Sequence, residues 1–162
     1  MTWTEVRELQ RAGIQFGSHT VNHPKLYQLS WSEIQDELAQ SKQTIEKHLG
    51  ERISSFAYPY AFPQEDNEFV ERLAKLLRKC GYDNCATTAI GRMGQEGNPF
   101  WVKRLPANGS DDQSLLLSKM KGDYDWMRHP QFLSRWARSR LHHSRRNNFP
   151  VDSEAVDFAK LV

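Results

Sequence analysis

Two histidines at short spacing are the residues of this chain best suited to chemistry. His19 and His23 lie four positions apart within the segment FGSHTVNHP, residues 16–24. Neutral imidazoles are ligands that zinc selects, and a catalytic zinc site commonly takes three protein ligands. The pair therefore predicts a metal site with a third ligand from elsewhere. An incidental, solvent-exposed pair is the alternative, because His-x-x-x-His by itself is a weak pattern.

The elements around the pair are expected to place it at the end of a strand. Residues 14–18 predict a short strand, in which Gly17 allows a close backbone approach. Capping-box patterns and apolar periodicity predict further helices and strands. We expect helices over 2–13, 30–50, 67–80 and 111–121, and strands over 53–58, 84–88 and 101–105. This alternation is typical of a parallel α/β sheet or barrel, whose working groups lie at the C-terminal ends of strands.

Length and composition indicate one domain without a membrane span. The chain has 162 residues, of which 38% are hydrophobic and 26% charged, and its net charge is only +2. No apolar run approaches the roughly 20 residues of a spanning helix. Cys80 and Cys85 are the only cysteines. They predict buried thiols, since small disulfide frameworks use more cysteines.

Two segments resemble signatures of a known family. GSHTVNHP at residues 17–24 is similar to the second signature of the polysaccharide deacetylases, the NodB-like homology domain of carbohydrate esterase family 4. FAYPY at residues 56–60 is similar to their third signature. The resemblance implies an α/β fold, a partial and distorted (β/α) barrel of TIM-barrel-like type. It also implies a metal-dependent hydrolase that removes N-acetyl groups from an N-acetylated polysaccharide or oligosaccharide.

The resemblance further implies roles for three residues. His19 and His23 would be ligands of a divalent metal, most commonly Zn²⁺. The backbone N–H of Tyr60, which follows the signature proline, would donate to the developing oxyanion. The chemistry is coherent, because the metal would polarise the acetamide carbonyl while a backbone donor receives the charge.

Three other residues are candidate contacts with the glycan. Tyr58 and Trp101 could stack on sugar rings, and Arg104 lies at the end of a predicted strand. Core packing is the alternative for the two aromatic residues. A solvated strand end is the alternative for Arg104.

The chain departs from the family pattern at the first signature, usually Thr-Phe-Asp-Asp, which supplies the catalytic base and the aspartate ligand. No such pair follows a strand here, since Asp111 and Asp112 lie in a polar turn. We therefore expect the third ligand to be absent from this chain, metal binding to be weak, and turnover to be slow or absent. A missing first strand would leave an open sheet edge available for self-association. Ala57 occupies a position that is arginine in many members.

The chain is expected to divide at residue 106. Residues 1–106 would form the N-terminally incomplete barrel, and residues 107–162 a helical, arginine-rich extension packed on it or trailing it. Six arginines between 128 and 146 support a rival function, the binding of nucleic acid or another polyanion, although a solvated basic helix is more common. A non-catalytic deacetylase remnant is a further alternative. No signal peptide is visible, so no localisation is predicted.

Overall fold

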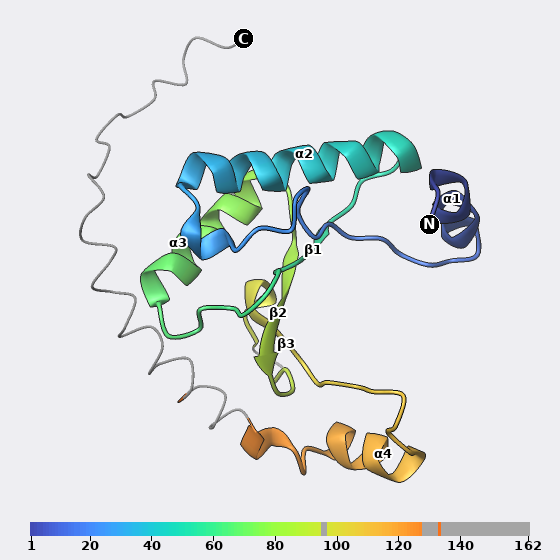
Figure 1. The fold of residues 1–162 in the computed structure, drawn as a ribbon, viewed down its shortest axis with the longest axis vertical. Coiled ribbons are helices and arrows are strands. Elements are labelled where there is room, and N and C mark those ends of the chain that lie inside the picture. Colours follow the sequence, from blue (N-terminus) through green and yellow to red (C-terminus); the bar gives the residue numbers. More distant parts are fainter. Residues whose placement is uncertain (95–96, 128–132, 134–162) are drawn as a thin grey trace.

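In the part of the chain that the structure describes, two α-helices precede the first of three short strands, and further helices lie between and after the strands (Figure 1). The computed structural model describes residues 1–94, 97–127 and 133. In chain order the elements, with 3₁₀ turns marked η, are α1 (Trp3–Arg11), η1 (Leu26–Gln28), α2 (Trp31–Leu49), β1 (Ser55–Ala57), α3 (Asn67–Lys79), β2 (Asn84–Ile90), η2 (Pro99–Trp101), β3 (Val102–Arg104), α4 (Gln113–Lys121) and η3 (Asp125–Met127).

Local sequence signals set the ends of the first helices. The pairs Thr2–Glu5 and Ser30–Glu33 form capping boxes, in which the hydroxyl and the carboxylate each accept a backbone N–H at the start of the helix. α2 ends at Gly50, whose left-handed φ of 71° suits glycine. The capping boxes and the end of α2 confirm the predictions made from the sequence.

The strands β1, β2 and β3 form a parallel sheet in that order. On the free side of β1, Ser18 forms an isolated parallel bridge with Phe56. Its N–H donates to the carbonyl of Ser55 at 2.9 Å, and its carbonyl accepts from the N–H of Ala57 at 2.8 Å. The strand predicted over residues 14–18 is therefore wrong in extent, because Ser18 is the one residue of that range that pairs with β1.

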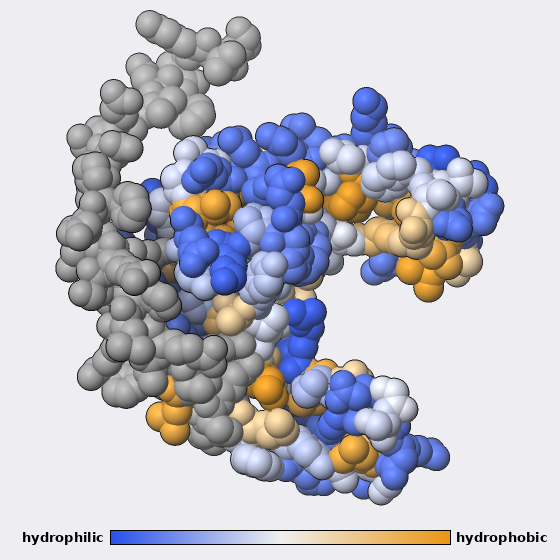
Figure 2. Space-filling view, in the orientation of Figure 1, coloured by the Kyte–Doolittle hydropathy of each residue, from blue (hydrophilic) through white to orange (hydrophobic). Residues whose placement is uncertain are grey.

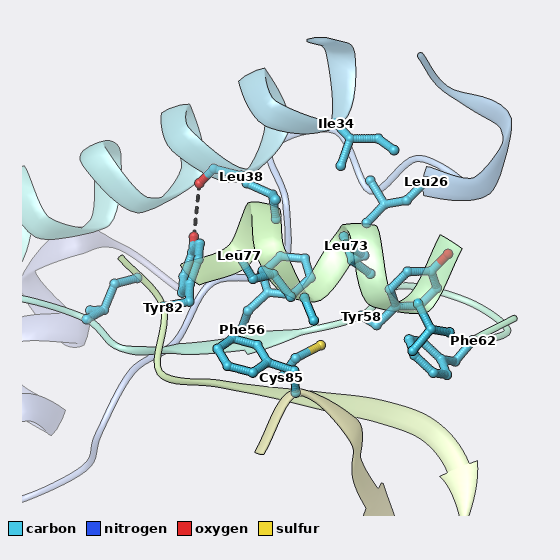
Figure 3. Close-up of a cluster of buried hydrophobic side chains, with 14 of the residues drawn as sticks. Leu26, Ile34, Leu38, Phe56, Tyr58, Phe62, Leu73, Leu77, Tyr82 and Cys85 are labelled. Carbon is cyan, nitrogen blue, oxygen red and sulfur yellow. Dashed lines mark hydrogen bonds between the residues drawn. The ribbon is translucent and has the colours of Figure 1, made fainter. Parts of the chain in front are cut away.

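α2 and α3 lie on one face of the sheet and form the core with it (Figure 3). Full burial of a large apolar side chain stabilises by roughly 1.5–3 kcal/mol, so this cluster fixes both helices against the strands. Its fully or almost fully buried members include Leu26, Ile34, Leu38, Phe56, Tyr58, Phe62, Leu73, Leu77, Tyr82 and Cys85.

The two cysteines are free thiols. Cys85 points into the core, and burial raises the pKa of its thiol to about 12. Cys80 is partly buried at the end of α3, and burial raises the pKa of its thiol as well. The prediction of buried thiols is confirmed for Cys85, whereas Cys80 is only partly buried.

α1 and α4 lie at opposite ends of the described region, and the surface is hollowed between them (Figure 2). Both helices expose apolar side chains, including Leu9 on α1 and Met120 on α4. α4 begins at Gln113, later than predicted, because the carboxylate of Asp112 caps it by accepting the N–H of Leu115 at 2.7 Å.

The C-terminal predictions lie mostly outside the described residues. This holds for the arginine cluster at 128–146, on which the polyanion-binding alternative depends. Of the helices that the structure describes, none is long and apolar enough to cross a membrane.

Candidate metal centre

The loop from His19 to His23 begins directly after the bridge between Ser18 and β1. Thr20 and His23 have left-handed φ values of 72° and 53°, which cost non-glycine residues about 1–2 kcal/mol each. The Thr20 hydroxyl accepts the N–H of His23 at 3.0 Å and donates to the carbonyl of His19. The loop is therefore a tight turn that returns the second histidine to the first.

The two imidazole rings converge through their Nε2 atoms, which lie 3.0 Å apart. On the far side of the His19 ring, Nδ1 lies 2.7 Å from the carbonyl oxygen of Ala57. A carbonyl only accepts, so Nδ1 carries the proton and Nε2 keeps its lone pair. The acceptor is the backbone carbonyl of Ala57, so this bond does not depend on the type of side chain at position 57.

This arrangement fits a divalent metal. Nitrogen atoms 3.0 Å apart can share one ion at the roughly 2.0–2.1 Å of Zn–N bonds. A ligating histidine usually donates its second ring N–H to a carbonyl or carboxylate, as His19 does. Within the described ranges, no group of three His, Cys, Asp or Glu residues is placed to hold a metal. Among the described residues, His19 and His23 could therefore supply two ligands, fewer than the three protein ligands of a common catalytic zinc site.

Glu37 of α2 contacts the middle of the same loop. One carboxylate oxygen accepts the backbone N–H groups of Val21 and Asn22 at 2.7 and 3.0 Å, and the other accepts the side-chain amide of Asn22 at 2.6 Å. Partial burial acts to raise the pKa of Glu37, but these hydrogen bonds outweigh it and leave the pKa below its ordinary value. The carboxylate is thus ionised at neutral pH.

Tyr60 lies beside the histidine pair. Its ring centroid is 4.5 Å from that of His23, and its φ of 56° is left-handed. The Thr88 hydroxyl of β2 holds this conformation, since it donates to the Tyr60 carbonyl and accepts the N–H of Phe62, both at 2.8 Å. No acceptor for the backbone N–H of Tyr60 is found among the described residues. That N–H is therefore available to a ligand.

The three candidate glycan contacts lie in different surroundings. Tyr58 is fully buried and packs edge-on against Phe62, with ring centroids 5.1 Å apart, so its ring presents no face to a sugar. The core interpretation accounts for it. Trp101 is partly buried and packs against Phe62 at 5.6 Å. Arg104 is exposed, and its Nε donates to the carbonyl of Thr87 at 2.6 Å.

The structure thus brings together His19, His23 and Tyr60, and it adds residues that sequence reasoning missed. Glu37 and Thr88 bind backbone groups 15 and 28 residues away in the chain. The only local hint for Glu37 is its place beside the buried stripe of α2. For Thr88 the sequence offers no signal beyond its position in a strand.

These observations define an α/β protein with a parallel sheet, in which two convergent histidines follow Ser18, the residue bridged to the free side of β1. The family model for polysaccharide deacetylase matches residues 1–85, more than half of the 162 residues. The chain belongs to the polysaccharide deacetylase family. Enzymes of this family are hydrolases of C–N bonds that typically use a divalent metal and act on acetylated glycans.

Individual relatives agree with this assignment. YxkH of Bacillus subtilis (strain 168), which bears the name of a polysaccharide deacetylase, is 25% identical over 105 residues, which are 65% of this chain and 36% of YxkH. The solved Streptococcus pyogenes deacetylase PplD, in complex with acetate, superposes with a TM-score of 0.65 at 25% identity, covering 74% of this chain and 50% of PplD.

A polysaccharide deacetylase from Bacillus cereus, at 24% identity, has the same fold, with a TM-score of 0.61 and coverage of 74% of this chain and 36% of that one. The chain therefore spans between about a third and a half of the length of these relatives, with shares of 36% and 50%.

Proposed function

We propose that this chain carries the core of a metal-dependent deacetylase that removes N-acetyl groups from a polysaccharide or oligosaccharide. The convergence of the Nε2 atoms of His19 and His23 to 3.0 Å, beside Tyr60, is the observation that supports it most. Family membership supports an acetylated glycan as substrate. Hydrolysis of an acetamide releases acetate at neutral pH, and acetate is the molecule in the complex of PplD.

Each residue of the site has a defined task in this proposal. His19 and His23 would hold the ion, for which zinc suits two imidazoles. When bound there, zinc would polarise the acetamide carbonyl and lower the pKa of a water molecule. The hydrogen bond from His19 to Ala57 keeps the ring oriented. The backbone N–H of Tyr60 would donate to the oxygen on which negative charge develops.

The substrate and the rest of the fold extend the proposal. Trp101 and Arg104 remain candidate glycan contacts, because both keep exposed surface. The sheet would be part of a distorted barrel formed by residues 1–106, with residues 107–162 as an extension. Its open side would lie next to Ser18, where the neighbouring Ile14 is 51% exposed. This edge is the surface through which the protein would self-associate.

We expect the third ligand, an aspartate in the family pattern, not to be supplied by this chain. With two ligands, the isolated chain should bind zinc weakly and turn over slowly or not at all. Measurable zinc-dependent deacetylation of N-acetylglucosamine oligomers by the 162-residue chain would contradict this expectation of impairment. It would leave the assignment of the reaction intact.

Titration calorimetry of the metal-free chain with zinc tests the site itself. We expect one weak zinc site that is lost in His19→Ala and in His23→Ala. His48→Ala is the matched control, because His48 stacks on Trp3 with centroids 4.0 Å apart and has no place in the proposed site. Equal zinc affinity in all three variants would refute the metal centre.

A further inference from the structure

A carboxylate outside the histidine pair holds the loop that joins the two ligands. We infer that Glu37 is a positioning residue of the metal centre, which fixes the loop so that the Nε2 atoms of His19 and His23 meet at one place. The expected effect of Glu37 on zinc affinity rests on the proposed function. The effect of Glu37 on the conformation of the loop does not, since it depends only on hydrogen bonds within the chain.

The loop depends on side chains for its backbone hydrogen bonds. The three consecutive N–H groups of Val21, Asn22 and His23 all donate to side-chain oxygens, two of them to Glu37 and one to Thr20. Among the described residues, no backbone carbonyl accepts any of these three N–H groups. Without Glu37, the backbone N–H groups of Val21 and Asn22 would lose their acceptor, and the left-handed turn would be held only by the Thr20 hydroxyl and the contacts of the two imidazole rings.

Glu37 links the loop to a helix that is packed in the core. Its neighbours on α2, Ile34 and Leu38, are fully buried in the core. One turn later, the hydroxyl of Ser41 lies 2.6 Å from that of Ser18, the residue before His19. The helix thus contacts both the base and the middle of the loop, and a shift of the Glu37 carboxylate would move the two imidazoles relative to each other.

The role of the length of the Glu37 side chain can be separated from the role of its charge. The carboxylate accepts three hydrogen bonds, from the backbone N–H groups of Val21 and Asn22 and from the side-chain amide of Asn22, and none of these contacts requires a proton from it. Glutamine has the same length, so its Oε1 can accept the two backbone N–H groups while the Asn22 amide rotates to present its oxygen. Aspartate keeps the charge but is one methylene shorter. Rescue by glutamine and not by aspartate is therefore the signature of positioning.

Two measurements on the full chain test the inference. The first is zinc affinity by calorimetry, where we expect Glu37→Ala and Glu37→Asp to weaken binding by about 10-fold or more, as loss of an outer-shell partner does. Glu37→Gln should recover most of that loss. Asp36→Asn, an exposed neighbour on the same helix, should bind as the wild type does.

The second measurement is amide hydrogen exchange at Val21 and Asn22 in the metal-free protein. Both amides should exchange about 10-fold faster or more in Glu37→Ala, because each loses its acceptor. Exchange in Asp36→Asn should be unchanged. Glu37→Asp serves both measurements if the alanine variant does not fold.

The outcomes distinguish this inference from the proposed function. Zinc affinity and amide exchange that remain at wild-type values in Glu37→Ala and Glu37→Asp would overturn the role of Glu37, while loss of zinc in His19→Ala would still support the metal centre. A wild-type chain that binds no zinc, but whose Val21 and Asn22 amides lose protection in Glu37→Ala, would refute the metal centre and retain the hold on the loop.

Discussion

The Nδ1 atom of His19 lies 2.7 Å from the carbonyl oxygen of Ala57, a residue 38 positions further along the chain. The contact exists because Ser18 pairs with β1 and so brings the start of the loop alongside the end of that strand. It gives the imidazole a fixed orientation and a fixed tautomer. The pairing of Ser18 with β1 therefore orients the Nε2 atom of His19 toward His23 and leaves its lone pair free of a proton.

This relationship predicts the tautomer of His19. In the metal-free protein at a pH where the imidazole is neutral, the proton should reside on Nδ1, because the Ala57 carbonyl can only accept. Long-range ¹⁵N–¹H correlation spectra distinguish the two tautomers. His48, which is stacked on Trp3, is the reference in the same spectrum. A His19 protonated only on Nε2 would show that the contact is absent in solution.

The close approach at Gly17 predicts that alanine is not tolerated there. A Cβ at this position would lie 2.8 Å from the carbonyl oxygen of Ser55, the same atom that accepts the N–H of Ser18. Gly17→Ala should lower the free energy of unfolding by about 1–3 kcal/mol, the usual cost of an overpacked site.

Urea denaturation measures this change. Gly94→Ala is the control, because a Cβ there would meet nothing within 4 Å. Equal stability of the two variants would show that the segment before His19 does not lie against β1 as described.

Thr88 is predicted to stabilise the Tyr60 turn through its hydroxyl. Thr88→Val keeps the shape of the side chain but leaves the N–H of Phe62 and the carbonyl of Tyr60 without this partner. We expect a loss of about 1–3 kcal/mol in the free energy of unfolding, measured by urea denaturation. Thr88→Ser retains the hydroxyl and should lose less. A valine variant as stable as the serine variant would contradict this role.

The left-handed backbone of Tyr60 predicts an unusual order of stability between two small residues. Tyr60→Gly and Tyr60→Ala both remove the ring that packs on His23, so the comparison isolates the backbone. At a φ of 56°, glycine should be the more stable by about 1 kcal/mol, although it is the more flexible residue when unfolded. Thermal or urea unfolding decides the order, and a more stable alanine variant would refute the left-handed conformation.

Much of the architecture follows from local patterns in the sequence. The capping boxes at Thr2 and Ser30 and the end of α2 at Gly50 use contacts within one or two turns of a helix. The same holds for the apolar spacing that buries Ile34 and Leu38. Such patterns lie within a few residues, and they predicted helices that the structure confirms.

The sequence also determined what kind of protein this is. The segments GSHTVNHP and FAYPY resemble two signatures of the polysaccharide deacetylases, the family to which the chain belongs. Gly17 predicted a close backbone approach before the first histidine, and the structure places it against Ser55. The family prediction rests on the resemblance of short segments to known signatures, and the prediction for Gly17 rests on the small size of glycine, and both can be read from a few neighbouring residues.

Only the tertiary structure decided how the pair is held. That the Ala57 carbonyl meets His19, and that Glu37 meets the loop, depends on segments 38 and 15 residues apart. The same is true of the burial of Tyr58, which the sequence left open, and of the reduction of the predicted strand to Ser18. Periodicity states which face of an element is apolar, but packing alone selects which distant backbone group lies next to each side chain.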